Sequence, residues 1–313
     1  MKYFLSLQQI RSLPEWVSEA RDLKKDPYRD QSLGKNKVLC LLFFNNSLRT
    51  RLSTQKAALH LGMEVIVMNF GSEGWVLEYE DGSVMDQGSA EHVREAAQVI
   101  AQYCDIVGIR AFAELKDRKL DQAEQIITAF AKFSGIPVVN LESSVGHPLQ
   151  ALADAITLAE NNTLKRPKIV LSWAPHPRPL PHAVANSFIE MMKKQQGAEF
   201  IITNPPGYDL DPGIREGITV EHDQSKALAG ADFIYAKNWS SFEHYGQVLS
   251  QDKDWMITME KLGKARFMHC LPVRRNMVVE DAVLNSQSSL VIQQANNRTY
   301  AAQIVLKKLL QHL

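Results

Sequence analysis

The chain has 313 residues, of which 45% are hydrophobic and 22% are charged, so it can bury a sizeable core, and its length predicts two domains. Lysine and arginine together number 35, as do aspartate and glutamate, so no overall charge favours nucleic acid or an anionic membrane, and we expect neither as a partner. The three cysteines, Cys40, Cys104 and Cys270, have no paired or metal-ligand spacing. No apolar run approaches the roughly 18 residues of a membrane span, and the N-terminus lacks the apolar core of a signal peptide, so we expect a reduced, cytoplasmic enzyme.

In the first half of the chain, short apolar runs alternate with helical patterns. Strands are predicted at Val38–Phe44, Glu64–Asn69, Asp105–Arg110 and Pro137–Leu141, and helices around Arg51–Leu61, Glu91–Tyr103 and Leu120–Phe133. This βαβ series predicts a parallel sheet covered on both faces. Residues 71–90 interrupt it with a long polar loop that carries Trp75, and loops of this length are often functional.

The second half begins with a predicted helix at Pro148–Asn161 and repeats the alternation. Its predicted strands are Lys168–Trp173, Glu199–Thr203, Asp232–Lys237, Arg266–Cys270 and Ser289–Gln293, and the last helix is Arg298–Leu313. The predicted fold class is therefore α/β, with two doubly wound parallel-sheet domains joined by helices. We expect one domain at residues 1–147, with the helix 298–313 packing back on it, and a second at 148–297.

The run Phe44–Arg51 joins the first predicted strand to a helix and carries two arginines and two hydroxyl groups. With Ser47 as the expected helix cap, the free N–H groups and dipole of the helix start would attract an anion, and an arginine fork fits phosphate oxygens. The run lacks the glycines and lysine of a Walker loop, and no G-x-G-x-x-G motif occurs in the chain. An ordinary capped helix with solvated arginines is an equally good interpretation of this run alone.

Polar residues also close several other predicted strands, where doubly wound folds place their functional groups. Arg110 and Glu142 end two strands of the first series, and His147 precedes a helix that begins with proline. Lys237 and Cys270 end two strands of the second series. Singly, such residues are usually surface arginines, structural histidines or buried thiols; together they indicate a site.

Three motifs carry a resemblance to the carbamoyltransferase family over nearly the whole chain. S-x-R-T-R occurs at Ser47–Arg51, H-P-x-Q at His147–Gln150 and H-C-L-P at His269–Pro272. Within the family the chain resembles the N-acylornithine branch, through Trp75 and the segments 173–180, 236–239 and 270–276. The lysine of the second segment stands in the region where ornithine enzymes carry an aspartate for the α-amino group, and it suits an acyl oxygen or carboxylate instead.

The resemblance implies a site for carbamoyl phosphate made of Ser47, Leu48, Arg49, Thr50, Trp75, Arg110, His147, Gln150, Cys270, Leu271 and Arg298. Thr50, Arg110 and His147 would donate to the carbamoyl oxygen in the transition state. Cys270 would position the attacking amine, with covalent catalysis a weaker alternative. A neighbouring subunit would supply Trp75, so the expected form is a homotrimer with shared active sites. Neither a metal nor another cofactor is implied.

For the acceptor, the resemblance implies Ala90, Glu142, His176, Arg178, Lys237 and Arg274. Glutamate at the position of Ala90 goes with acetylornithine enzymes, and alanine leaves room for a longer acyl group without adding negative charge. The expected reaction is carbamoyl transfer to the δ-amine of N-succinyl-L-ornithine, which yields N-succinyl-L-citrulline and phosphate in arginine biosynthesis. Two alternatives remain: transfer to N-acetylornithine, and a non-catalytic regulatory homologue that only binds carbamoyl phosphate.

Overall fold

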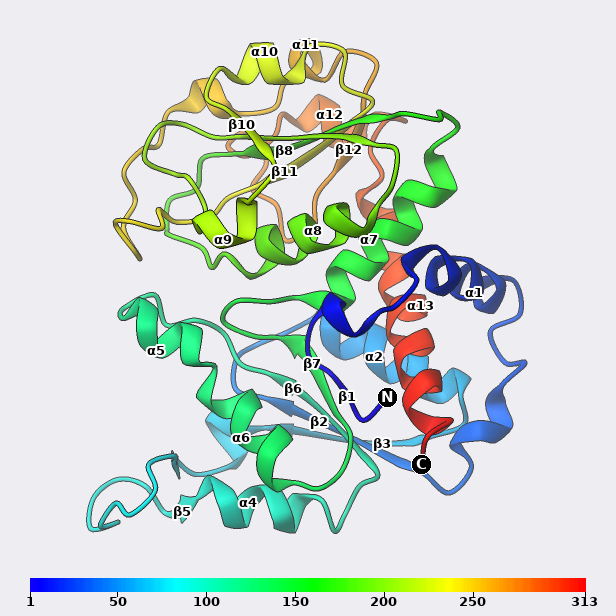
Figure 1. The fold of residues 1–313 in the computed structure, drawn as a ribbon, viewed down its shortest axis with the longest axis vertical. Coiled ribbons are helices and arrows are strands. Elements are labelled where there is room, and N and C mark those ends of the chain that lie inside the picture. Colours follow the sequence, from blue (N-terminus) through cyan, green and yellow to red (C-terminus); the bar gives the residue numbers. More distant parts are fainter. The chain divides into compact units, whose positions relative to one another are not determined.

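A computed structural model describes residues 1–313 and divides the chain into two compact units, each with its own parallel sheet (Figure 1). Unit 1 contains residues 1–114, 119–152 and 298–313, and unit 2 contains residues 115–118 and 153–297. Helices α7 (Pro148–Asn161) and α13 (Val291–Leu310) each contribute residues to both units. The division falls after Leu152, inside α7, whereas the sequence-based division stands before Pro148.

The sheet of unit 1 has the strand order β1-β7-β6-β2-β3, and all neighbours are parallel. Its strands are β1 (Tyr3–Phe4), β2 (Val38–Phe43), β3 (Glu64–Asn69), β6 (Ile106–Arg110) and β7 (Val138–Glu142). The central strands are apolar on both faces because helices cover both. Gly108 lies in the centre of β6, where a side chain would come within 3.0 Å of Leu41. The four predicted strands are confirmed, and the two-residue β1 was too short to predict.

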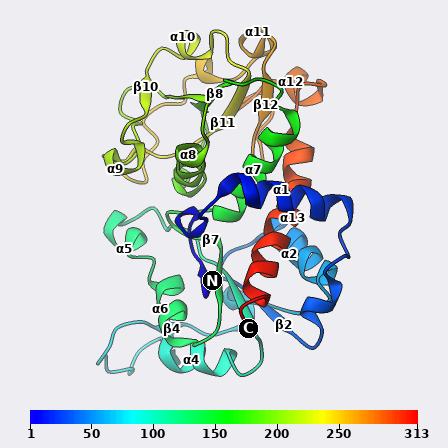
Figure 2. The ribbon, with the colours of Figure 1, turned by 45° about the vertical axis from the view of Figure 1, so that its right-hand side comes forward.

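The helices of unit 1 are η1 (Leu7–Gln9), α1 (Leu13–Lys25), η2 (Gln31–Gly34), α2 (Arg49–His60), α3 (Phe70–Glu73), α4 (Val93–Ile100), α5 (Arg118–Ala123) and α6 (Gln125–Phe133). Helices α4 and α6 lie on one face of the sheet, and α2 and α13 lie on the other (Figures 1 and 2). Val93 and Phe130 pack against Val107 and Ile109 of β6. The helix predicted at Leu120–Phe133 is interrupted at Glu124, whose φ of +47° is incompatible with a continuous helix.

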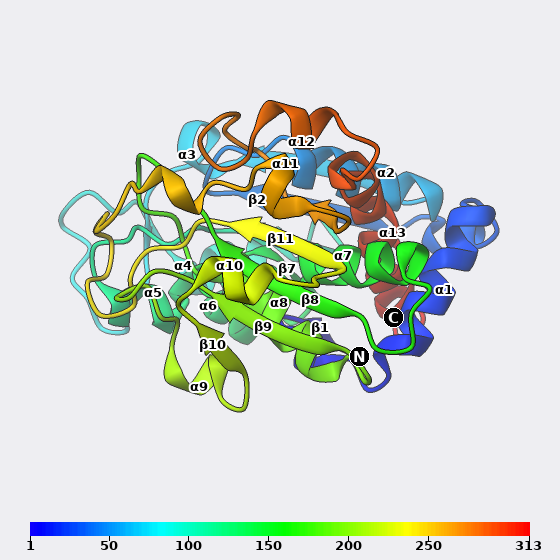
Figure 3. The same cartoon turned by 90° about the horizontal axis from the view of Figure 1, so that it is seen from above.

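The sheet of unit 2 has the order β10-β9-β8-β11-β12 and is also parallel throughout (Figure 3). Its strands are β8 (Lys168–Trp173), β9 (Glu199–Thr203), β10 (Thr219–Glu221), β11 (Phe233–Lys237) and β12 (Arg266–Met268). The strand predicted at Ser289–Gln293 is wrong. Ser289 makes one isolated bridge to Phe267, and the following residues open helix α13. A short apolar run fits a strand and a buried helix turn equally well, so periodicity could not separate them.

The helices of unit 2 are α8 (Ala183–Lys194), α9 (Pro212–Arg215), α10 (Gln224–Leu228), η3 (Lys253–Trp255), α11 (Met259–Leu262) and α12 (Asp281–Asn285). Alternate residues of β11 face opposite sides of the sheet. Tyr235 stacks on Phe188 of α8 with ring centroids 4.6 Å apart, whereas Ile234 belongs to the core formed with Leu228 and Leu262. Together the two units confirm the predicted α/β class.

Residues 71–90 form an open loop beside α4 (Figures 1 and 2). A short parallel ladder closes it, with β4 (Leu77–Glu78) paired to β5 (Glu91–His92). Trp75, Val76 and Val84 of this loop are exposed. Such a group of exposed apolar side chains is typical of a surface that contacts another molecule. None of the helices combines the length and apolarity required to cross a bilayer.

His182, at the start of α8, makes the stability of unit 2 depend on pH. Burial lowers the pKa of His182, against the opposing effect of its 2.8 Å hydrogen bond to the Ser240 carbonyl. The unfolded chain therefore binds the proton more tightly than the folded chain does. The neutral imidazole therefore adds to the free energy of unfolding. We expect this contribution to be fully present above about pH 6.5, the pKa of histidine in the unfolded chain, and to be lost as the pH falls toward the lower pKa of His182 in the folded chain.

Urea denaturation between pH 7.5 and 5.5 tests this expectation. His182→Gln should show a smaller decrease in unfolding free energy over that range than the wild type, whatever constant loss the substitution causes. His312→Gln, at an exposed position, provides the control and should keep the wild-type slope. Parallel curves for His182→Gln and the wild type would contradict the assignment.

Candidate active site

Arg110 and Glu142 end neighbouring strands of unit 1 and form a buried ion pair. A register shift after Ile109 brings Arg110 opposite Glu142, and its Nε lies 3.2 Å from the Glu142 carboxylate. Nη1 donates to the main-chain oxygens of Asn45 and Asn46, and the guanidinium stacks on Phe112 at 3.8 Å. These contacts fix the guanidinium and leave Nη2 for a ligand. Burial lowers the pKa of Arg110, and Glu142 opposes that shift, so the side chain keeps its charge.

Arg298 of α13 connects Thr50 to His147. Its Nη2 donates to Thr50 Oγ1 at 2.6 Å and lies 3.3 Å from His147 Nε2. Because arginine can only donate, Thr50 Oγ1 and His147 Nε2 both act as acceptors. The Thr50 hydroxyl proton therefore points away from Arg298. For a neutral His147, we assign the ring proton to Nδ1. Glu142 Oε2 lies 3.5 Å from the same Nε2 nitrogen of His147, and although two acceptors share no hydrogen bond, this places Thr50, Arg110, Glu142, His147 and Arg298 in one group.

The predicted cradle at Ser47–Thr50 lies at the start of α2, but Ser47 is not its cap. The helix begins after Leu48, and no side chain caps it. The N–H groups of its first turn therefore point outward without a competing side-chain oxygen, which is the arrangement that binds anions. Leu48 is 64% exposed and Thr50 is buried. Gln150, in the first turn of α7, is also buried.

Arg51, the second arginine of the cradle motif, has a structural role. Its guanidinium donates to the Asn69 side chain and lies over the ring of Phe43 at 4.9 Å. Glu73 binds the same asparagine through its main-chain and side-chain nitrogens. Arg51 thus anchors the corner that leads into the loop 71–90.

In unit 2, Cys270 and Leu271 lie in a turn that follows β12. Cys270 is buried, and Leu271 has a φ of +55°, which is unusual for a residue with a branched side chain. The Leu271 N–H donates to His269 Nδ1 at 2.9 Å. The fully buried Tyr235 lies beside Cys270. Burial raises the Tyr235 pKa, and the charges of Asp154 and Cys270 raise it further, so the phenol stays neutral.

Three of the residues expected to bind the acceptor form a cationic group in unit 2. His176 Nδ1 donates to the Arg178 carbonyl at 2.7 Å, and its Nε2 accepts from Arg274 Nε at 3.1 Å. Burial lowers the pKa of His176, and the charges of Arg274, Lys237 and Arg178 lower it further, so at neutral pH the imidazole is uncharged among three cations. A carboxylate would relieve that repulsion. Arg275, by contrast, pairs with Asp281 at 3.0 Å.

The tryptophans of this region have a packing role. Trp173 Nε1 donates to the Trp239 carbonyl at 3.0 Å, and Trp239 Nε1 donates to the Tyr208 carbonyl at 2.7 Å. Both indoles are fully buried. They join the ends of β8 and β11. The chain continues from β8 to His176, and Lys237 is the last residue of β11. The segments 173–180 and 236–239 therefore form a rigid base for the cationic group.

Trp75 and Ala90 lie together on the loop 71–90, apart from the contacts described above. Trp75 Nε1 donates to Glu91 at 2.9 Å, and the Ala90 N–H donates to the Val76 carbonyl at 3.0 Å. Trp75 is 57% exposed. The ladder β4-β5 therefore presents both residues on one protruding segment of unit 1.

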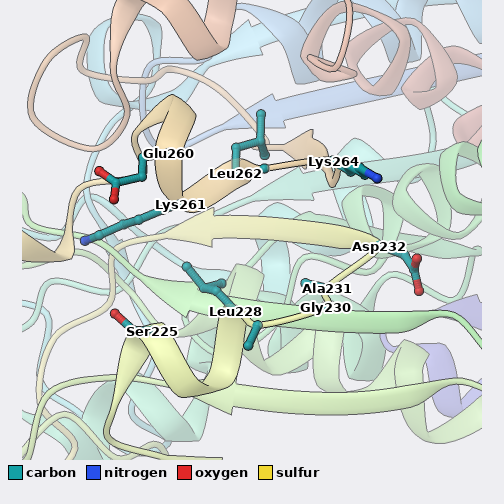
Figure 4. Close-up of a pocket in the computed structure, with 11 residues that line it drawn as sticks. Ser225, Leu228, Gly230, Ala231, Asp232, Glu260, Lys261, Leu262 and Lys264 are labelled. Atoms are coloured by element: carbon teal, nitrogen blue, oxygen red, sulfur yellow. The ribbon is translucent and has the colours of Figure 1, made fainter.

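One cavity of unit 2 lies away from this end of the sheet. A cavity of about 670 Å³ lies between α10 and α11, with Asp232, Glu260, Lys261 and Lys264 among its lining residues (Figure 4). Asp232 and Lys264 precede β11 and β12, so the cavity is at the end where the strands begin. Ligands of doubly wound sheets bind at the opposite end, where the strands finish. No group of three or more histidine, cysteine or acidic side chains is arranged to hold a metal ion.

Sequence reasoning missed several residues that shape the site. Phe112, Asn45 and Asn46 hold Arg110, and Asp154, Tyr235 and Gln294 lie next to the Cys270 turn. Asp154 offered a signal, because it is a carboxylate four residues after Gln150 in an otherwise apolar stretch of helix. The main-chain oxygens of Asn45 and Asn46 offered none, since a carbonyl contact is independent of residue type.

Two models of the aspartate/ornithine carbamoyltransferase family match this chain. The model of the carbamoyl-P binding domain matches residues 2–160, and the model of the Asp/Orn binding domain matches residues 181–309. N-succinylornithine carbamoyltransferases of Bacteroides fragilis and Bacteroides thetaiotaomicron are 50% and 49% identical to it, over 100% of each chain. N-acetylornithine carbamoyltransferase of Xanthomonas axonopodis pv. citri is 33% identical, over 99% of this chain and 96% of its own.

Solved structures of N-acetyl-L-ornithine transcarbamylase have the same fold as this chain. One, complexed with acetylcitrulline, has a TM-score of 0.92 and 33% identity, over 99% of each chain. Another is a variant with one glutamate replaced by alanine, complexed with carbamyl phosphate and N-succinyl-L-norvaline. It also has a TM-score of 0.92 and 33% identity, and the match covers 100% of its chain and 99% of this chain.

Proposed function

Because the chain belongs to the aspartate/ornithine carbamoyltransferase family, we propose that it transfers the carbamoyl group of carbamoyl phosphate to the δ-amine of N-succinyl-L-ornithine. The products are N-succinyl-L-citrulline and phosphate, in a step of arginine biosynthesis in the cytoplasm. One observation carries the proposal: the network of Thr50, Arg110, His147 and Arg298 directs several donors to one place in unit 1. The full-length similarity to N-succinylornithine carbamoyltransferases supports the choice of acceptor.

The phosphate group binds at the start of α2, through the uncapped N–H groups and Arg49. The carbamoyl oxygen accepts from Arg110 Nη2, from the Thr50 hydroxyl and from the Nδ1 proton of His147. Negative charge grows on this oxygen as the amine attacks, and fixed donors stabilise it more than they stabilise the ground state. Gln150 and the Leu271 carbonyl bind the carbamoyl amide. The departing phosphate accepts the proton of the δ-amine, and Cys270 positions that amine.

The acceptor binds unit 2 through its carboxylates. Arg178, Lys237 and Arg274 supply the charge and donors that a buried carboxylate requires, and His176 orients Arg274 by accepting from its Nε. N-succinylornithine has one more carboxylate than N-acetylornithine, so the cationic group favours it. We also propose that Glu142 contacts the acceptor, through the carboxylate oxygen that does not pair with Arg110.

We propose a homotrimer in which each active site receives Trp75 and Ala90 from a neighbouring subunit. The exposed loop 71–90 supports this, since Trp75 is more than half exposed and its indole N–H donates to Glu91 of the adjacent β5. Leu48, just before α2, and Leu52 and Leu59 of α2 are each more than half exposed and supply apolar area for an interface. Sedimentation equilibrium measures the mass of the assembly, and a monomer would overturn the shared site.

The proposed activity is tested by incubating the protein with carbamoyl phosphate and, separately, ornithine, N-acetyl-L-ornithine and N-succinyl-L-ornithine. We expect ureido product and phosphate to form fastest with N-succinyl-L-ornithine. A faster reaction with N-acetyl-L-ornithine, the substrate class of the relatives at 33% identity, would select the second candidate. No product with any acceptor, together with retained binding of carbamoyl phosphate, would identify a non-catalytic homologue.

A mixing experiment tests whether subunits share sites. Trp75→Ala removes the loop contribution and Arg110→Lys impairs the pocket, so each variant trimer should be nearly inactive. In trimers assembled at random from equal amounts, about a quarter of the sites combine an intact loop with an intact pocket. We expect activity to recover to that fraction of wild type. If native mass spectrometry shows that the subunits have exchanged and no activity returns, the sites are not shared.

A further inference from the structure

A buried polar chain in unit 2 joins two helices to the turn at His269–Leu271. Asp154 of α7 and Gln294 of α13 are both 0% exposed. Gln294 Nε2 donates to Asp154 Oδ1 at 2.6 Å, and Gln294 Oε1 accepts from the His269 N–H at 3.0 Å. One amide therefore connects a carboxylate to the main chain of the turn, and its orientation is fixed because only its nitrogen can donate to the carboxylate.

The turn needs such support. Leu271 holds a left-handed φ of +55°, a conformation that costs free energy for a residue with a branched side chain and persists only where surrounding contacts impose it. Within the turn, the Leu271 N–H donates to His269 Nδ1. The contact from Gln294 adds an anchor at the first residue of the turn, outside the turn itself.

The Asp154 carboxylate depends on the same contact. A fully buried carboxylate is stable only when neighbouring donors compensate for its lost hydration, and the Gln294 amide is one of them. The charges of Asp154 and Cys270 both raise the pKa of the buried Tyr235, so these side chains lie near one another. The hydrogen-bonded link from Asp154 to the turn is the one through Gln294 to His269.

We propose that Asp154 is a positioning residue: through the Gln294 amide it holds the main chain at His269–Leu271 so that the Cys270 thiol and the Leu271 carbonyl face the substrate. Asp154 and Gln294 need no contact with either substrate. The inference rests on the proposed function, because it assumes that this turn binds the carbamoyl group and the attacking amine.

The fold supplies a matched control one helical turn further along. Asn297 of α13 is also 0% exposed and donates to Thr157 and Glu160 of α7, each at 2.9 Å. It joins the same two helices as Gln294 does, and it too faces a carboxylate, but both of these hydrogen bonds go to α7. Gln294→Glu and Asn297→Asp thus make the same chemical change, an amide to an acid opposite a carboxylate.

The experiment measures kcat, KM and thermal unfolding for these two variants, for Asp154→Asn and for the double variant Asp154→Asn/Gln294→Glu. Gln294→Glu should lower kcat on the order of 100-fold, because small displacements of reacting groups have effects of that size. Its activity should improve as the pH falls, since a protonated glutamic acid can again donate to Asp154. Asn297→Asp should lower the unfolding temperature and leave kcat within about twofold.

The double variant exchanges acid and amide and so restores one negative charge and both hydrogen bonds, of which only the bond between residues 154 and 294 reverses its direction. We expect it to recover most of the kcat lost in Gln294→Glu, at all pH values. Asp154→Asn alone keeps an oxygen that can accept from Gln294 and should lose less kcat than Gln294→Glu does. Equal losses of kcat in Gln294→Glu and Asn297→Asp, or a double variant no better than Gln294→Glu, would overturn the proposal. A wild type that forms no carbamoylated product would instead overturn the proposed function, so the two failures are distinguishable.

Discussion

Replacing Arg110 with lysine should lower kcat by about 100- to 1,000-fold, the effect of removing one fixed donor to a developing oxyanion. Lysine keeps the positive charge beside Glu142 but cannot donate to that carboxylate, to the carbonyls of Asn45 and Asn46 and to a ligand at once. The KM for carbamoyl phosphate should change much less than kcat, because the donor stabilises charge that appears only in the transition state.

Arg110→Leu is a less suitable variant than the sequence suggests. A guanidinium at a strand end is expected to add little packing, yet Arg110 is only 6% exposed and is the ion-pair partner of Glu142. Leucine would leave that carboxylate buried without its partner and would destabilise the fold as well as remove the donor. Arg51→Lys is the matched control, since Arg51 is committed to Asn69. Wild-type turnover in Arg110→Lys would refute the catalytic role, and an equal loss in Arg51→Lys would show a structural effect.

Replacing Ala90 with glutamate should reverse the preference between acceptors. Ala90 lies beside Trp75 on the exposed loop, so in a shared site it would face the acyl end of the neighbour's acceptor. Glutamate would fill the space beyond an acetyl methyl and repel a succinyl carboxylate.

We expect the ratio of kcat/KM for N-succinyl-L-ornithine over N-acetyl-L-ornithine to fall by about 100-fold in Ala90→Glu, the product of a lost charge pairing and an added repulsion. Ala90→Gln is the control, because it has the same size without the charge. A similar fall in Ala90→Gln would attribute the selection to volume alone. An unchanged ratio in Ala90→Glu, or a wild type that prefers N-acetyl-L-ornithine, would refute the selector role.

The sequence by itself determined the fold class and the positions of most strands. Runs such as Val38–Phe43 and Ile169–Leu171 are apolar on every residue, and only a parallel sheet covered on both faces buries such runs. The motifs at Ser47, His147 and His269 indicated the family for a related reason. Anion binding at a helix start and donors at strand ends need particular residue types at fixed spacing, and spacing is visible in a sequence.

Only the tertiary structure decided which polar residues work together. Arg51 and Arg49 look alike in the motif, but Asn69, distant in sequence, binds Arg51. Glu142 pairs with Arg110 because a register shift places them opposite each other, and Gln294 reaches both Asp154 and His269 because α7, α13 and the turn meet in unit 2. Hydrogen bonds act over about 3 Å in space, whatever the separation along the chain. Local pattern therefore specified the strands and the motifs, while the partners of each charged group emerged only from the packing of elements far apart in the sequence.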